Sequence, residues 1–324
     1  MSTITKIQQQ IAPELLALNK LIADTLSSPN ELMNRIVDNY LLTKGKQIRP
    51  IMVILSAKLF GDINENVIRA AASVELLHNA SLIHDDVVDE TKLRRNKPTI
   101  NGIWDNHIAV LVGDFFVSSS LQLAMLTSDL RIIDAIAKLG RMLSIGELDQ
   151  IYCARFHHIS EEAYMQTIHR KTASLFMACV EMGGYAMGAS ADEIAHIREF
   201  ARLLGLCFQI KDDIFDYYAD SNIGKPTGND LREGKITFPL LHVLENESAP
   251  DHEAMVKLSQ KETLTTGEIN TLISYAKDNG GIEYAYGKMR ELQQQALPHL
   301  KAFGNREIAE SLEKVLAYTI EREA

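Results

Sequence analysis

Apolar residues recur at spacings of three and four along nearly the whole chain, and alternating runs of β-branched residues are rare. The first spacing places side chains on one face of an α-helix, whereas alternation would indicate strands. Only 8 prolines and 18 glycines interrupt the pattern. The sequence therefore predicts an all-α protein, with helices near residues 4–26, 29–43, 48–60, 64–90, 105–126, 129–154, 160–189, 191–219, 236–247, 266–279, 281–303 and 305–322.

Several of these helices carry local start and stop signals. The segments Ser28 to Glu31, Ser190 to Glu193 and Thr265 to Glu268 each place a hydroxyl residue three positions before a glutamate, which is the pattern of a capping box. The first segment also has a proline where the helix would begin. Gly61 and Gly280 follow apolar runs and predict helix ends.

No linker rich in glycine, serine or proline separates the predicted helices. A chain of 324 residues with 46% hydrophobic content can bury a large core. We therefore expect residues 1–324 to form one domain, a single large helical bundle around a central cavity. The net charge is −10 and the basic residues are scattered, so nucleic acid is not an expected partner.

Cysteine usage and the amino terminus bear on location. Cys153, Cys179 and Cys207 are odd in number and lack metal-ligand spacing, which indicates buried free thiols in a reducing compartment. The first residues resemble neither a signal peptide nor a transit peptide. We expect that no apolar run reaches membrane-spanning length. The protein is expected in the cytoplasm, with at most transient membrane contact.

Carboxylates cluster at the end of the predicted helix 64–90. Asp85 and Asp89 are four residues apart, so on a helix both side chains leave one face about 5–6 Å apart, with Asp86 beside them. Carboxylates without histidine or cysteine suit Mg²⁺, which keeps some waters and shares its other positions with substrate phosphates. This box predicts a magnesium site.

The pattern recurs at the end of the predicted helix 191–219. Asp212, Asp213 and Asp216 form a second box, and its first carboxylate lies 127 positions after Asp85. A single acidic run is more often a solvated helix end than a metal site. Two such boxes are not expected by chance, so together they favour metal binding.

Basic residues accompany the boxes, and each has a plainer alternative. Lys46 and Arg49 lie at a turn before a helix and are suited to bind a diphosphate, but a solvated basic turn looks the same. Arg94 and Arg95 follow the first box and are suited to neutralise a phosphate-rich ligand, although a solvent-facing pair is the alternative. His78 alone is as typical of a hydrogen-bonded helix histidine.

Further polar residues lie in the second half of the chain. Lys171 and Thr172 interrupt a helix rich in alanine, methionine and leucine, where a lysine needs a partner or extends to water. The glycine- and proline-containing segment 221–235 is typical of a loop, and Lys225 and Lys235 are placed to close over a diphosphate. No Gly-x-x-x-x-Gly-Lys loop and no His-Glu-x-x-His motif occurs, so a kinase-like phosphate loop and a catalytic zinc are not expected.

In order and spacing, these motifs resemble those of the trans-polyprenyl diphosphate synthases. The resemblance covers most of the chain and rests on Gly45 to Pro50, Glu75 to Glu90, Arg94-Arg95, Gly113-Asp114, Lys171-Thr172, Gln209 and Gly224 to Asp230. It implies an all-helical isoprenoid synthase fold, a homodimer, and head-to-tail condensation of isopentenyl diphosphate with an allylic diphosphate. The product would be an all-trans polyprenyl diphosphate, such as a quinone side chain requires.

The resemblance also implies roles for single residues. The ligands of Mg²⁺ would be Asp85, Asp89 and Asp212, accompanied by Asp86 and Asp216. The residues that bind isopentenyl diphosphate would be Lys46, Arg49, His78 and Arg95, and Arg94 would contact the allylic diphosphate. The groups whose dipoles lie near the reacting carbon would be Lys171, Thr172 and Gln209. The segment from Glu245 onward shows no motif, so packing is its expected role.

Two rival functions share part of this pattern. A helical terpene cyclase has the first aspartate box but no need for Lys46, Arg49 and His78, which would bind a second diphosphate. A binding subunit that has lost catalysis would not be expected to retain both complete boxes together with Arg94 and Arg95. The pattern therefore favours the synthase.

Small residues before the first box concern product length. Ser81 lies four residues before Asp85 and on its face, whereas the place of Ala80 on the cavity wall relies on the resemblance. Short-chain members of the family commonly have a bulky aromatic residue here, so the small residues imply a hexaprenyl to decaprenyl product with a floor near Leu121. The alternative is that both residues are small because another helix packs closely.

Overall fold

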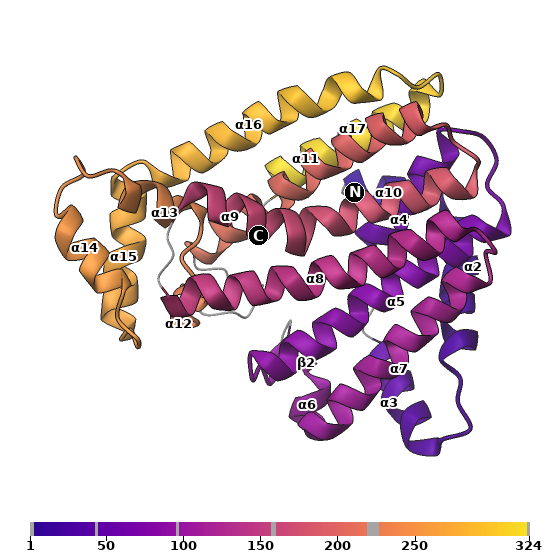
Figure 1. The fold of residues 1–324 in the computed structure, drawn as a ribbon, viewed down its shortest axis with the longest axis horizontal. Coiled ribbons are helices and arrows are strands. Elements are labelled where there is room, and N and C mark those ends of the chain that lie inside the picture. The colour runs from indigo at the N-terminus through magenta and orange to yellow at the C-terminus, as the bar shows by residue number, and fades with distance from the viewer. Residues whose placement is uncertain (1–2, 43–44, 95–96, 157–159, 219–226, 323–324) are drawn as a thin grey trace.

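The chain folds almost entirely into helices, as shown in the computed structural model (Figure 1). The structure describes residues 3–42, 45–94, 97–156, 160–218 and 227–322. The first half contains α1 (Thr3–Gln10), α2 (Ala12–Leu26), α3 (Glu31–Leu41), α4 (Ile48–Lys58), α5 (Glu65–Val88), α6 (Ile100–Ile103), α7 (Asn106–Met125) and α8 (Leu130–Phe156). The strands β1 (Leu93–Arg94) and β2 (Lys97–Pro98) form one small antiparallel pair.

The second half is also helical, and the prediction of an all-α fold is confirmed. It contains α9 (Glu161–Ile168), the π-turn η1 (His169–Ala173), α10 (Ser174–Ala186), α11 (Ala191–Asp216), α12 (Asn229–Arg232), α13 (Phe238–Glu245), α14 (His252–Ser259), α15 (Thr266–Asp278), α16 (Gly281–Leu300) and α17 (Arg306–Glu321). The two aspartate boxes therefore lie at the carboxyl ends of α5 and α11.

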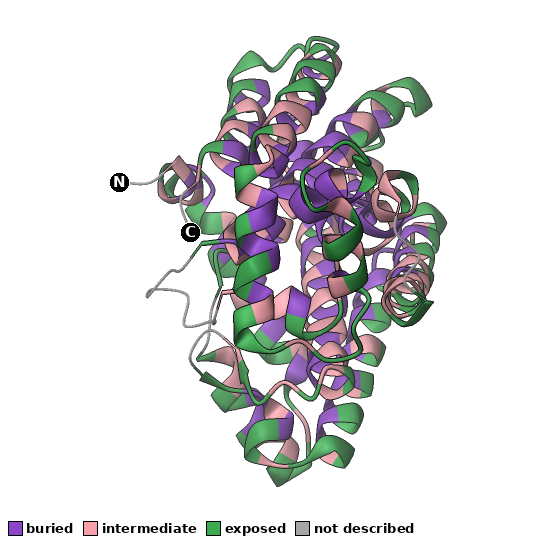
Figure 2. Ribbon diagram, turned by 90° about the vertical axis from the view of Figure 1, so that its left-hand side faces the viewer, coloured by how far each residue is buried: buried purple, intermediate pink, exposed green. Residues whose placement is uncertain are grey.

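The long helices α5 and α11 lie inside the bundle. Helix α5 packs against α4, α7 and α10, and α11 packs against α10 and α16. In α5 the consecutive residues Ala70 to Val74 are all buried, as are Pro50 to Ala57 in α4. A helix that is buried on every side belongs to the interior, and Figure 2 shows buried residues where the helices face one another.

A buried polar pair joins α5 to α7. The Ser73 hydroxyl donates to the backbone carbonyl of Ser120 at 2.9 Å, and the Ser120 hydroxyl donates to the carbonyl of Ser73 at 2.7 Å. Each hydroxyl thus finds a partner on the opposite helix, which removes the cost of burying it. The two helices are held in close register behind the first aspartate box.

Several predicted helix boundaries were wrong for local reasons. The predicted helix 4–26 is broken at Ile11, because Pro13 in the first turn of α2 has no N–H to donate. Asn30, not Ser28, caps α3, and its side chain accepts from the Met33 amide at 2.9 Å. The capping boxes of α11 and α15 are present as predicted. Helix α14 was missed, since its eight residues give too short a periodic signal.

The expectation that no apolar run reaches membrane-spanning length was wrong for α7. This helix is long and apolar enough to cross a membrane, judged by length and composition alone. Core helices of other proteins meet the same test, and 44% of the most apolar stretch of α7 is buried within the protein. Buried residues such as Val112 and Phe116 belong to the core, whereas Leu111 and Met125 are exposed. Helix α7 is therefore a core helix with an uncovered apolar side.

Candidate active site

The carboxylates of the first aspartate box lie in different surroundings. Asp86 is buried, and its Oδ1 accepts from Arg94 Nε at 3.0 Å and lies 2.8 Å from Arg94 Nη2. The Asn101 side chain also donates to the Asp86 carbonyl at 2.9 Å. The contact of Arg94 fastens β1 to α5, and the contact of Asn101 fastens α6 to α5. Asp89, in contrast, lies 3.5 Å from Lys235 Nζ, which comes from the segment after the second box.

Asp85 carries a strongly perturbed carboxyl group. Burial is the largest cause that raises its pKa to about 6, the negative charges of Glu147 and Asp89 add to this effect, and Lys171 opposes it. Negative groups from α5 and α8 are therefore crowded together in a poorly hydrated place. A divalent cation would relieve this repulsion, and an all-oxygen donor set suits a hard cation.

The second box also divides its carboxylates. Asp216 accepts from the backbone amides of Asn229 at 2.9 Å and Asp230 at 3.1 Å, and so holds the start of α12 against the end of α11. Asp213 is buried within the helix bundle. Asp212 forms an ion pair with Arg322. Structural contacts thus account for Asp86 and Asp216, whose predicted part in metal binding stays a prediction.

The carboxyl-terminal helix contributes to this region, which corrects the assignment of mere packing. Besides the ion pair of Arg322, Lys46 Nζ donates to the Tyr318 hydroxyl at 3.0 Å. The guanidinium groups of Arg322 and Arg49 lie 4.3 Å and 5.5 Å from the centroid of the Phe208 ring. The predicted basic cluster and the second box therefore meet through the last turn of α17.

Lys171 and Thr172 lie on the π-turn η1, between α9 and α10. Such turns are rare and recur at functional sites. Lys171 Nζ forms an ion pair with Glu147 and donates to Gln150 Oε1 at 3.0 Å. Both partners lie on α8 and were missed, because nothing in the periodic pattern of α8 distinguishes them from solvated residues.

Two glycines allow neighbouring helices to approach the π-turn. A Cβ atom on Gly146 of α8 would lie 2.9 Å from the Lys171 backbone nitrogen. A Cβ atom on Gly205 of α11 would lie 2.5 Å from Ala173 Cα. Since real Cβ atoms do not approach backbone this closely, both positions require glycine for the observed packing.

Gly205→Ala should destabilise the protein by about 1–3 kcal/mol, because the added methyl group forces α11 away from the π-turn. Thermal unfolding should show a lower Tm. Gly287→Ala in α16 is the matched control: its Cβ would meet nothing within 4 Å, and helix propensity should leave its Tm unchanged or slightly higher. Equal Tm values for the two variants would contradict this account of the packing.

A hydrogen-bonded chain leads from the π-turn to the second box. The Thr172 hydroxyl donates to Gln209 Oε1 at 2.6 Å, and Gln209 Nε2 donates to Asp213 Oδ1 at 2.9 Å. The Tyr164 hydroxyl donates to Asp213 Oδ2 at 2.6 Å. Burial, reinforced by the charge of Asp230, raises the pKa of Asp213 to about 8 despite these two donors. Tyr164 was not predicted, since a lone tyrosine carries no motif.

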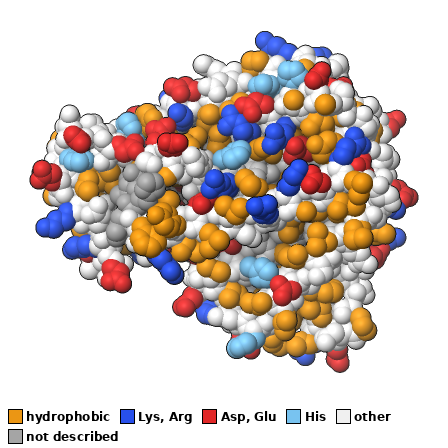
Figure 3. All heavy atoms as spheres, viewed as in Figure 1, with side chains coloured by type: hydrophobic (Ala, Val, Ile, Leu, Met, Phe, Trp, Pro, Cys, Tyr) orange, Lys and Arg blue, Asp and Glu red, His pale blue; other side chains and the backbone are white. Residues whose placement is uncertain are grey.

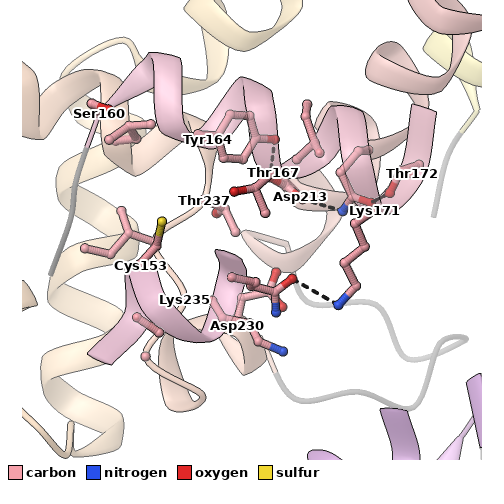
Figure 4. A pocket seen from close by; sticks show the side chains of 17 residues that line it. Cys153, Ser160, Tyr164, Thr167, Lys171, Thr172, Asp213, Asp230, Lys235 and Thr237 are labelled. Atoms are coloured by element: carbon pink, nitrogen blue, oxygen red, sulfur yellow. Dashed lines mark hydrogen bonds between the residues drawn. The ribbon is translucent and has the colours of Figure 1, made fainter. Parts of the chain in front are cut away.

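A pocket of about 210 Å³ brings four predicted residues together (Figure 4). Its wall includes Lys171, Thr172, Gln209 and Lys235, which come from three separate segments of the chain. Burial acts to lower the pKa of Lys235, but the charges of Glu233, 2.6 Å away, and of Asp89 together raise it. The predicted residues Arg95 and Lys225 lie outside the described residues.

The small residues before the first box do not line this pocket. Ala80 is fully buried, so close packing accounts for its size as well as a product cavity does. The Ser81 hydroxyl donates to the carbonyl of His78 at 2.8 Å, within α5, and both residues are half-buried. Leu121 is 40% exposed, which does not fit the floor of an enclosed cavity in a single copy of the chain.

Among the described residues, no three carboxylate, histidine or cysteine side chains converge to complete a metal site by themselves. Instead, Arg322 pairs with Asp212, Arg94 with Asp86 and Lys235 with Asp89. A cation that shares its coordination between a few carboxylates, waters and phosphate oxygens needs no preformed protein cage.

Comparisons with known proteins identify this arrangement. The polyprenyl synthetase family model matches residues 30–276, which is most of the chain. The chain belongs to the polyprenyl synthetase family. It is 30% identical to octaprenyl diphosphate synthase of Escherichia coli (strain K12) over 321 residues, which cover 99% of each chain. It is therefore a trans-prenyltransferase that makes polyprenyl diphosphate.

Solved structures of the family match the whole fold. A polyprenyl synthase from Caulobacter crescentus, complexed with calcium and isoprenyl diphosphate, has a TM-score of 0.92 at 28% identity and covers 99% of this chain and 98% of its own. Geranylgeranyl pyrophosphate synthase from Bacteroides thetaiotaomicron has a TM-score of 0.85 at 36% identity and covers 99% and 100%. The prenyltransferase thus resembles enzymes named for products of different lengths.

Proposed function

We propose that this prenyltransferase adds isopentenyl diphosphate repeatedly to an allylic primer and releases a hexaprenyl to decaprenyl diphosphate for a quinone side chain. The observation that carries the proposal is the contact of Lys235 with Asp89, which joins the segment after the second aspartate box to the first box. The full-length match to an octaprenyl diphosphate synthase supports the product range.

Mg²⁺ is the cation that best fits the carboxylates, and Asp85, Asp89 and Asp212 would hold it. Bound there, it would neutralise the diphosphate leaving group of the allylic substrate. The calcium-bound relative from Caulobacter crescentus supports a divalent cation in this fold. Asp86 and Asp216 would hold β1 and α12 in place around this site.

The side chains of the protein would bind the two diphosphates and stabilise the allylic cation. Lys46, Arg49 and His78 would bind the diphosphate of isopentenyl diphosphate, with Arg95 as a further donor. Arg94, Lys225 and Lys235 would neutralise the allylic diphosphate. Lys171, Thr172 and Gln209 line the pocket where the allylic carbon becomes cationic, and the oxygen atoms of Thr172 and Gln209 would stabilise that charge. With both substrates bound, the pocket would exclude water, and the released diphosphate would accept the proton.

A homodimer fits the uncovered apolar side of α7. Figure 3 shows hydrophobic side chains along the face of the molecule where α7 and α8 run. Leu111, Met125 and Leu130 are 64%, 66% and 80% exposed, and exposed apolar patches of this kind mark interfaces. A second copy of the chain is the proposed partner, with at most transient membrane contact and a cytoplasmic location. Analytical ultracentrifugation tests this point: a monomer at micromolar concentration would refute it.

One assay tests the function. Purified protein is incubated with Mg²⁺, farnesyl diphosphate and labelled isopentenyl diphosphate, and dephosphorylated products are separated by chromatography. Label in chains of 30 to 50 carbons is the expected result. A product of 20 carbons would show that the enzyme makes only short chains. Cyclisation without isopentenyl diphosphate would indicate a cyclase. Activity that appears only after a partner chain is added would indicate a subunit of a two-chain enzyme.

Ser81→Phe should shorten the product while sparing the first condensation, because Ser81 lies one helical turn before Asp85 and half-buried on α5. Ser81 is the better test position, since Phe at the fully buried Ala80 would also disturb the core. The readout is chain length by chromatography, with Ser81→Ala as the control. Unchanged length in Ser81→Phe would place the growing chain elsewhere.

A further inference from the structure

Tyr164 joins two walls of the pocket. It lies on α9, and its hydroxyl reaches Asp213 on α11 at 2.6 Å. Its ring stacks on Phe238 of α13, with ring centroids 5.0 Å apart and an interplanar angle of 26°. A hydroxyl held by a stacked ring is a fixed donor, and Figure 4 shows it directed at Asp213.

The contact of Tyr164 determines what Asp213 offers to Gln209. Asp213 Oδ2 accepts from Tyr164, so Oδ1 is the oxygen that faces Gln209. An amide opposite a carboxylate oxygen presents its NH₂ group, and Gln209 Nε2 donates at 2.9 Å. The other end of the amide, Oε1, therefore points to Thr172, whose hydroxyl donates to it at 2.6 Å.

We propose that Tyr164 is a positioning residue for prenyl transfer: through Asp213 it fixes the side-chain amide of Gln209 so that the carbonyl oxygen, not the NH₂ group, lies beside Thr172 in the pocket. The inference rests on the proposed function of Thr172 and Gln209 near the allylic carbon. Tyr164 itself acts indirectly, because Asp213 and Gln209 lie between it and Thr172 in the chain of hydrogen bonds.

The orientation matters because the reacting carbon becomes positively charged. Oxygen atoms with fixed negative partial charge stabilise a cation in a water-excluded site, whereas an amide NH₂ group would repel it. Without the tyrosine hydroxyl, Asp213 keeps a single donor, and its carboxylate can turn away from Gln209. An amide that has lost this acceptor is free to adopt both orientations. In part of the molecules, the NH₂ group of Gln209 would then face the developing cation in place of the carbonyl oxygen.

Tyr164→Phe tests the inference with single-turnover rates of the first condensation at about pH 9, where Asp213, with its pKa of about 8, is ionised and both of its oxygens accept. The rate should fall about tenfold, and the KM values for both substrates should stay within about twofold, because no group that binds diphosphate is removed. Tyr284→Phe is the matched control. It removes a hydroxyl that donates to a carboxylate, Glu161, at the same distance of 2.6 Å, and its ring belongs to the same aromatic stack, 5.4 Å from Phe238. This control should keep the wild-type rate.

A double-mutant cycle separates positioning from general damage. If Tyr164 acts through Gln209, Tyr164→Phe should slow the enzyme less than about twofold in a Gln209→Ala background. The same tenfold loss in that background, or no loss in the wild-type background, would overturn the inference alone. A wild-type rate for Gln209→Ala would overturn the proposed function of Gln209 and the inference with it.

Asp213→Asn provides a second test should Tyr164→Phe unfold. Tyr164 would hold the asparagine oxygen and leave its NH₂ group facing Gln209, which would then turn its own NH₂ group to Thr172. The first-condensation rate should fall at least tenfold with unchanged KM values and a near-wild-type Tm. A wild-type rate in this variant would overturn the inference.

Discussion

Asp85→Asn should lower turnover on the order of a thousandfold at saturating Mg²⁺, a barrier increase of about 4 kcal/mol. Burial raises the pKa of Asp85, and the nearby negative charges of Glu147 and Asp89 raise it further, so a cation would be attracted to this carboxylate. An asparagine keeps the shape but removes the charge that would hold the cation. Steady-state incorporation of labelled isopentenyl diphosphate measures the effect.

Asp134→Asn is the control for this prediction, since Asp134 is an exposed carboxylate on α8 that pairs with Lys138, four residues away on the same helix. It should keep full turnover. Wild-type turnover in Asp85→Asn would contradict the assignment of Asp85 as a metal ligand.

Asp85→Asn should also be more stable than the wild type in the absence of metal. The folded-state pKa of Asp85, about 6, lies above its ordinary value of 3.8, so the folded protein binds this proton more tightly than the unfolded chain. Stability is therefore lost as pH rises from about 4 to about 6, by up to about 3 kcal/mol, and remains lower above that range. Asp85→Asn should raise the Tm at pH 7 and not at pH 4. An equal gain at both values would show that the carboxyl group is not the cause.

Arg49→Ala should raise the KM for isopentenyl diphosphate about 10- to 100-fold and change the KM for the allylic primer much less. Its guanidinium lies 5.5 Å from the Phe208 ring centroid and 5.8 Å from the Phe176 ring centroid, and these two rings pack against each other, so the group is oriented before substrate arrives. A lost charge-assisted hydrogen bond from such a group is worth about 1.5–3 kcal/mol. Initial rates with each substrate varied in turn provide the two KM values.

Arg69→Ala provides the control for Arg49→Ala. Arg69 lies on α5 and pairs with Glu65 one turn away, 2.8 Å apart, at the end of the helix opposite the first box. Both KM values should match the wild type in this variant. Equal increases for the two substrates in Arg49→Ala would mean that Arg49 supports the whole site rather than one diphosphate.

The sequence predicted those features that repeat or cluster along the chain. Helices followed from apolar periodicity, and the boxes at Asp85 and Asp212 followed from spacing within one helix turn. Arg322 and Tyr318 could not be found this way, because each is a single polar residue on an amphipathic helix and approaches the site only when α17 packs against α11. A pattern in sequence contains no information on such long-range contacts unless they coincide with a motif.

The π-turn and the partners of the boxes were missed for a related reason. One extra residue in a helical turn barely changes the apolar pattern, so α9 and α10 looked like one regular helix. The pairing of Asp86 with Arg94 depends on a hairpin of two-residue strands, too short for alternation to be detected. Carboxylates of one box therefore appeared equivalent in sequence, although the fold gives them different surroundings.

The π-turn has a genetic consequence. Its wider loop accommodates one residue more than a regular α-helical turn, so loss of a single codon between His169 and Ala173 would restore an ordinary helix there. The faces of α9 and α10 would stay nearly aligned, because the wider turn is what absorbs the extra residue. The turn itself would be lost, and with it the place of Lys171 between α8 and α11 and the contact of Thr172 with Gln209. An in-frame deletion of one codon, elsewhere often a mild lesion, would be expected here to abolish the enzyme as thoroughly as a frameshift.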